Sequence, residues 1–152
     1  MGELVQVELT IPMVADQELV AAMTAEQLAE NLCFERKAVD QIRLAVIEAC
    51  TNAFEHSESP DRRVYMNFLC DEDKLLIMVR DFGKGFDPMG VKEPHIREKL
   101  KAIRRRGWGL MLIRKLMDEV EFVDVAPEVG TLLCMTKYRG RPSCPAGTPA
   151  PS

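Results

Sequence analysis

Two strand-like stretches separated by only three residues constrain the fold more than any other feature of the sequence. Over residues 63–70, apolar side chains alternate with more polar ones, as in a strand with one buried face. A second strand-like run covers residues 74–80, and Asp71-Glu72-Asp73 forms the turn between the two. Such a short connection allows only an antiparallel hairpin. At least part of the sheet must therefore consist of antiparallel neighbours.

The remaining elements indicate an α+β fold. The chain shows no internal repeat and no domain linker, so its 152 residues are expected to form one domain. We predict helices packed on one face of a mixed, mostly antiparallel sheet. Residues 83–106 show no clear period, and the Pro-rich tail from residue 140 is expected to be disordered. The predicted strands are 4–11, 63–70, 74–80, 121–125 and 131–137, and the predicted helices are 16–32, 36–56 and 108–117.

Composition excludes several classes of protein. A net charge of −4 and a pI of about 5.3 argue against a general nucleic-acid binder. No apolar run is long enough to cross a membrane, and the first residues lack a secretory signal. The five cysteines are scattered and include no C-x-x-C pair. We therefore expect reduced, mostly buried cysteines in a cytoplasmic protein.

The second predicted helix carries the first candidate for chemistry. Glu48 and Asn52 are four residues apart and stack on one helix face, in a stripe that Gln41 and Glu55 extend. The simpler interpretation is an amphipathic helix that shows its polar face to water. The alternative is a site in which the carboxylate takes a proton from a hydroxyl group or water. In that site the amide oxygen would complete a Mg²⁺ shell beside nucleotide phosphates.

The second candidate is Asp81, at the end of an apolar row on its strand, followed by Gly83 and Gly85. A carboxylate directed toward a core needs a hydrogen-bond donor, and an adenine amino group would serve. The two glycines would let the backbone approach such a ligand closely. The alternative is a turn with a solvated aspartate.

The third candidate is the junction between a basic segment and the last helix. From Gly90 to Arg106 there are seven Lys or Arg and two Glu, a local charge of +5 in an acidic chain. Gly107 and Gly109 follow at the helix start, where backbone N–H groups and the helix dipole favour an anion. This arrangement indicates a phosphate neighbour. A flexible basic loop and a nucleic-acid patch are the alternatives, and the absence of a P-loop lysine motif excludes a Walker-type site.

Taken in chain order, the three motifs resemble those of the GHKL superfamily of ATP-binding domains, which includes gyrase, a heat-shock chaperone, histidine kinases and MutL. The likeness is greatest to the small stand-alone anti-sigma-factor serine kinases that control sporulation and stress responses in bacteria. It covers about residues 5–138. The segments that carry it are EACTNAFEHS, RDFGKGFDP and RRGWGLMLIRKLMDEVEFVDVAPEVGT.

The resemblance implies a two-layer α/β sandwich that binds ATP and Mg²⁺. Glu48 matches the residue that activates the substrate serine, Asn52 the Mg²⁺ ligand and Asp81 the carboxylate that reads the adenine amino group. Residues 90–106 match the ATP lid, within a domain of residues 1–138 followed by a tail of residues 139–152. The other matches are Gly83 and Gly85 beneath the base, Gly107 and Gly109 at the phosphates, Thr131 near the adenine, and Arg105 and Arg106 where lid cations could meet the β- and γ-phosphates.

The function that the resemblance implies is that of an ATP-dependent protein serine kinase and anti-sigma factor. Such a protein phosphorylates a serine of an anti-anti-sigma partner and binds a sigma factor, commonly as a homodimer. The alternative is a GHKL module that binds nucleotide and sequesters a partner without catalysis. Direct nucleic-acid binding through the basic lid is a third hypothesis, which the acidic remainder of the chain disfavours. His56, beside Asn52, is interpreted as a structural or phosphate-proximal residue, because the chain has no room for the helix pair that carries a phosphoacceptor histidine.

Overall fold

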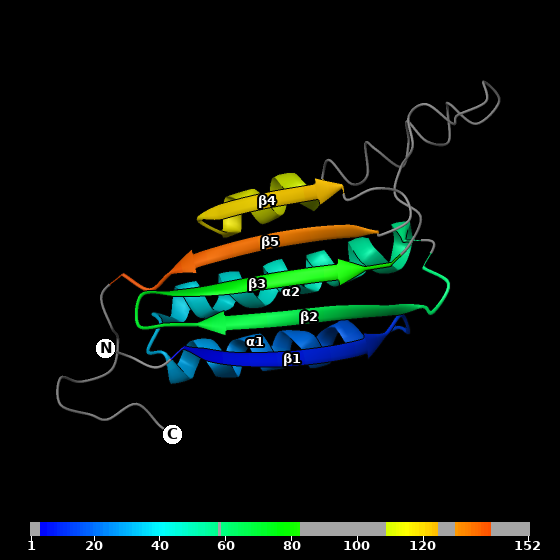
Figure 1. Ribbon diagram of the computed structural model, residues 1–152. Helices are drawn as coiled ribbons and strands as arrows, with labels where there is room; N and C mark the ends of the chain where they lie inside the picture. Colours follow the sequence, from blue (N-terminus) through cyan, green and yellow to red (C-terminus); the bar gives the residue numbers. More distant parts are fainter. Residues whose placement is uncertain (1–3, 58, 83–108, 125–129, 141–152) are drawn as a thin grey trace.

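The computed structural model describes residues 4–57, 59–82, 109–124 and 130–140 (Figure 1). Five strands form one sheet in the order β1-β2-β3-β5-β4, and α1 and α2 lie on the same face of it (Figure 1). The predicted α+β class and the placement of helices on one face are therefore confirmed. Every described strand pair is antiparallel, so this sheet lacks the mixed character that we expected. The elements are β1 (Val5–Pro12), α1 (Gln17–Asn31), α2 (Arg36–His56), β2 (Arg63–Cys70), β3 (Lys74–Asp81), β4 (Glu119–Asp124) and β5 (Thr131–Tyr138), with a further helical segment at 109–116.

Element boundaries follow the sequence pattern closely. The bounds of α2 agree with the prediction, and β2 and β3 form the expected hairpin. Strand β4 begins at Glu119, two residues before the predicted start. Pro12, one residue beyond the predicted end of the first strand, is the last residue of β1, on the edge strand where a missing N–H is tolerated.

The core lies between the sheet and the helices. Alternate residues of β2 and β3 are buried against the helix layer, and Phe68 and Ile77 are inaccessible to solvent. The buried face of α1 consists of alanines, which allow α1 and α2 to approach closely. The larger side chains of α2 then fill the space above the sheet. The buried helix residues are Ala21, Ala22, Ala25 and Ala29 of α1, and Val39, Ile42, Ala45, Val46, Ala49 and Cys50 of α2.

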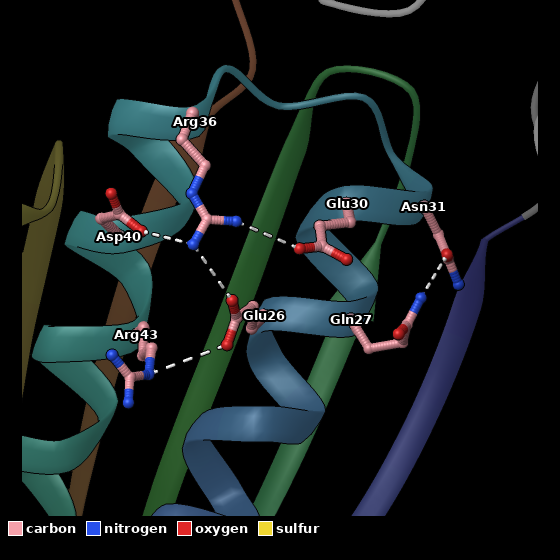
Figure 2. Close-up of polar contacts among 7 residues, drawn as sticks. All are labelled: Glu26, Gln27, Glu30, Asn31, Arg36, Asp40 and Arg43. Atoms are coloured by element: carbon pink, nitrogen blue, oxygen red, sulfur yellow. Dashed lines mark hydrogen bonds and ion pairs between the residues drawn. The ribbon is translucent and has the colours of Figure 1, made fainter.

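Charged side chains join the outer surfaces of the two helices (Figure 2). Arg36 Nη2 lies 3.5 Å from Glu26 Oε1 and 3.2 Å from Asp40 Oδ1, and Arg36 Nη1 lies 3.4 Å from Glu30 Oε1. Arg43 Nε reaches the other oxygen of Glu26 at 3.7 Å. Since the Arg36 side chain is 68% exposed, these pairs orient the helix junction and add little to stability.

Helix α1 ends in a Schellman motif that places a cysteine in the left-handed region. Cys33 has φ of 62°, and its N–H donates to Glu30 O while the N–H of Phe34 donates to Ala29 O. Cys33 is disulfide-bonded, so the expectation that all five cysteines are reduced is wrong at this position. Cys50, Cys70 and Cys134 are free. Nothing in the sequence indicated this bond, because the cysteines are odd in number and form no recognisable disulfide framework.

Candidate functional site

Asp81 and Thr131 form the base of the site. They face each other in the register of β3 and β5, and both point to the helix side of the sheet, where they are 5% and 6% exposed. The Thr131 hydroxyl donates a 2.6 Å hydrogen bond to Asp81 Oδ2. A buried carboxylate requires such donors. The bond holds the carboxylate at the end of the apolar row that the sequence predicted.

Gly130 allows the two strands to meet at this point. Its φ is 88°, and a Cβ atom there would lie 1.9 Å from the backbone oxygen of Asp81. No side chain fits at that distance, so glycine is required for both its conformation and its close approach. The backbone at the aspartate therefore depends on a residue about fifty positions away in the chain.

Glu48 and Asn52 lie on the half-buried face of α2 and meet the start of the 109–116 segment. Gly109 is buried there, and a Cβ atom on it would lie 3.0 Å from Glu48 Oε1 and 3.8 Å from Asn52 Oδ1. Three predicted site residues, separated by as many as 61 positions, thus meet in the fold. Glu48 and Asn52 therefore face another element of the protein.

A pocket connects this junction to the Asp81 carboxylate. The space inside it is about 20 Å³, room for about one water molecule. Asn52 lies in its wall together with Asp81 and Thr131, which links the two halves of the predicted site. The lining residues are Ala49, Asn52, Ala53, Val79, Asp81, Phe122, Thr131 and Leu133.

The apolar wall of this pocket was missed in the sequence, although its signal was present. Val79 precedes Asp81 by two residues, and Leu133 follows Thr131 by two, so strand alternation places each on the face of its polar neighbour. Phe122 of β4 is the cross-strand neighbour of Leu133. These contacts depend on β5 lying between β3 and β4, which periodicity does not reveal.

The structure separates other members of the predicted polar stripe from the pocket. The Glu55 side chain is exposed on α2, and Glu55 Oε2 lies 3.8 Å from His56 Nε2. Gln41 lies toward the other end of α2, where its Oε1 accepts a hydrogen bond from Lys137. The remaining predicted site residues, Gly83, Gly85, Arg105, Arg106 and Gly107, lie outside the described residues, as does the lid at 90–106.

The site offers protein oxygen atoms suited to a metal ion that also binds the phosphates of a nucleotide. Within the described part of the chain, no group of three or more His, Cys, Asp or Glu side chains could hold a metal ion. Mg²⁺ in nucleotide sites is typically bound by one or two protein oxygens, by phosphates and by water. The amide oxygen of Asn52 next to the Glu48 carboxylate fits that pattern.

The one-sided antiparallel sheet with a pocket between α2, β3 and β5 agrees with the histidine kinase-like class of ATP-binding domains that the sequence resemblance implied. A family model described as "Histidine kinase-like ATPase domain" matches residues 13–137. Proteins named "Serine-protein kinase RsbW" are similar over most of both chains. The one from Oceanobacillus iheyensis is 30% identical over 87% of this chain and 85% of its own. The one from Halalkalibacterium halodurans is 32% identical over 89% and 84%. The chain therefore belongs to the RsbW family of serine-protein kinases, within the histidine kinase-like ATPases.

A solved structure supports the same fold. The crystal structure of the RsbU and RsbW domains of a Mycobacterium tuberculosis protein superposes with a TM-score of 0.66 at 17% identity. The match covers 91% of this chain and 33% of that chain. In addition, none of the helices in the described ranges has the length and apolar character needed to cross a membrane.

Proposed function

We propose that the protein is an ATP-dependent protein serine kinase and anti-sigma factor. In this proposal it phosphorylates a serine of an anti-anti-sigma protein and binds a sigma factor, as a homodimer in the cytoplasm, without direct contact to nucleic acid. The observation that carries the proposal is the junction of Gly109 with Glu48 and Asn52, continuous with the pocket at Asp81. Disulfides are rare in the cytosol, so the bonded Cys33 is unusual for the proposed cytoplasmic location.

The residues of the site fit a magnesium adenine nucleotide. The Asp81 carboxylate, held by Thr131, can accept a hydrogen bond from the adenine amino group. Asn52 supplies a hard oxygen ligand for Mg²⁺. Beside it, Gly109 has no side chain, so its backbone can approach a phosphate closely. Gly83, Gly85, Arg105, Arg106 and Gly107 are assigned to the same nucleotide by resemblance alone, within a domain of residues 1–138.

Glu48 is proposed as the residue that acts on the protein substrate. Its carboxylate accepts the proton of the serine hydroxyl as that oxygen bonds to the γ-phosphorus of ATP and ADP leaves. Asn52 orients the cation beside it, and Asp81 fixes the base at the far end of the pocket. Mg²⁺-ATP, when bound, supplies the phosphoryl group and a cation that neutralises phosphate charge. The kinase thus needs little beyond positioning and one carboxylate at the attacking oxygen.

The test combines binding and transfer. Calorimetry with Mg²⁺-ATP should show binding for the wild type and for Glu48→Gln, because the substitution keeps shape and leaves the Asp81 pocket intact. Transfer of labelled phosphate to a panel of anti-anti-sigma proteins should fall at least about a hundredfold for Glu48→Gln. Glu55→Gln, on the same helix but exposed, is the matched control and should transfer at the wild-type rate.

Two outcomes would redirect the proposal. If folded wild-type protein binds no Mg²⁺-ATP, the nucleotide site is wrong. If it binds Mg²⁺-ATP but transfers nothing to any partner, the alternative holds, namely a catalytically silent module that sequesters its partner.

A further inference from the structure

Lys137 is a buried cation that joins two helical elements. Its side chain is 10% exposed and lies on the helix face of β5, two residues beyond the buried Met135. Its Nζ donates a 2.8 Å hydrogen bond to Gln41 Oε1 of α2 and a 2.6 Å hydrogen bond to the backbone oxygen of Leu116. Asp118 Oδ1 lies 3.9 Å away. The ammonium group therefore connects α2 to the end of the 109–116 segment.

The same segment contacts the same helix at its other end. Gly109, its first described residue, packs against Glu48 and Asn52 of α2. Gln41 precedes Glu48 by seven residues, which corresponds to about 10 Å along a helix on nearly the same face. Ile113, between the two contacts, is fully buried. The segment thus lies along α2 with one contact at the candidate site and one at Lys137.

A cation is an unusual choice for this position. The row on β5 runs from Thr131 through Leu133 and Met135 to Lys137, and an apolar side chain could fill the last place. A buried charge with its partners often stabilises no more than an apolar residue of the same size. Packing alone therefore does not account for the lysine, whereas its two directed bonds fix the position of the segment relative to α2.

We propose that Lys137 is a positioning residue for the nucleotide site: by joining Gln41 to the Leu116 carbonyl, it sets how Gly109 lies against Glu48 and Asn52. This inference rests on the proposed function for its effect on nucleotide binding. Its first part, the control of the segment's position, does not depend on any ligand. Lys137 itself does not line the pocket, so any effect on the site is transmitted through the segment.

The test uses two variants that break the same link from opposite sides. Lys137→Met removes the ammonium group and retains the length of the side chain. Gln41→Ala removes only the acceptor on α2 and keeps good helix propensity. Lys74→Met is the matched control, because Lys74 lies on the neighbouring strand but on the face away from the helices.

The first measurement is amide hydrogen exchange of residues 110–117 in nucleotide-free protein, under conditions where every variant is fully folded. Both link variants should exchange about tenfold faster in this segment, and Lys74→Met should match the wild type. The second measurement is the calorimetric Kd for Mg²⁺-ATP, which should rise about tenfold for both link variants. Because they break one link, the double variant should bind no more weakly than Lys137→Met alone.

The outcomes separate this inference from the proposed function. Wild-type exchange and wild-type affinity in both link variants would overturn it. A lower unfolding temperature with unchanged exchange and affinity would make Lys137 merely structural and would overturn it as well. If Lys137→Met does not fold, Gln41→Ala decides. If the wild type itself binds no Mg²⁺-ATP, the proposed function fails, while the exchange experiment still tests the link.

Discussion

The Thr131 hydroxyl donates a 2.6 Å hydrogen bond to the Asp81 carboxylate of the neighbouring strand, between two residues that are fifty positions apart in the chain. The bond uses one carboxylate oxygen, and Asp81 and Thr131 line the same pocket as Asn52. Because the strand register places Thr131 opposite Asp81, the hydrogen bond that fixes this carboxylate is made within the protein itself.

Replacement of Asp81 by Asn should weaken ATP binding with little change in fold. The amide has nearly the same shape and can still accept from Thr131, but it replaces a charged acceptor by a neutral group that also donates. Loss of one hydrogen bond to a charged group predicts a Kd for Mg²⁺-ATP that is at least about tenfold higher in calorimetry. Thermal unfolding of Asp81→Asn checks that the fold is retained. Wild-type affinity in a folded variant would remove Asp81 from base recognition.

Gly130→Ala should be among the most destabilising single substitutions in this chain. The added Cβ would lie 1.9 Å from the Asp81 backbone oxygen at a φ of 88°, and a backbone atom cannot move aside cheaply. We expect a loss of about 3 kcal/mol or more in the free energy of unfolding, measured by urea denaturation. Gly140→Ala is the control. Gly140 has a φ of 66°, but a Cβ atom there would meet nothing within 4 Å, so only about 1 kcal/mol of backbone strain applies. Equal losses would show that close approach at Gly130 is unimportant.

Local patterns predicted the elements well and their tertiary partners poorly. Helix α2 could be bounded correctly because its apolar face is long and continuous, and the hairpin of β2 and β3 follows from a three-residue turn. The Gly109 contact with Glu48 depends on how two helical elements pack, which no local signal encodes. Gln41 was placed on the correct helix face, yet it binds Lys137, because a stripe seen in sequence does not tell which element covers each part of it.

Gly109→Ala should slow phosphate transfer while changing the free energy of unfolding little. Alanine favours a helix over glycine by up to about 1 kcal/mol, so the free energy of unfolding should change by no more than that. The new methyl group would lie 3.0 Å from Glu48 Oε1, a contact that the carboxylate can relieve only by moving. A displacement of the proposed base predicts about tenfold slower phosphate transfer to an anti-anti-sigma protein. An unchanged rate in this variant would mean that the position of Glu48 is not critical.

The charged network between α1 and α2 should contribute little to stability (Figure 2). Arg36→Ala removes three contacts at once, but its side chain is 68% exposed. We expect a loss below about 1 kcal/mol in the free energy of unfolding at low salt, and less at about 1 M NaCl because the charges are screened. Arg43→Ala, which removes the single contact to Glu26, should cost less still. A large loss that persists in high salt would show that Arg36 acts through packing.

Cys50 should make the native state sensitive to alkaline pH. Burial of its thiol, with a smaller effect of the Glu18 charge, raises the pKa of Cys50 from 9.0 to about 12. Between these values the unfolded chain releases a proton that the native state retains, so the unfolded state binds fewer protons and stability falls as pH rises. The free energy of unfolding falls by at most about 1.4 kcal/mol per pH unit. Urea midpoints of the wild type and Cys50→Ala, measured from about pH 8.5 to 11, should converge as the pH increases. Cys134→Ala is the comparison, because burial also raises the pKa of the Cys134 thiol but this residue is only partly buried. Parallel curves for the wild type and Cys50→Ala would show that the thiol ionises as readily in the folded protein as in the unfolded chain.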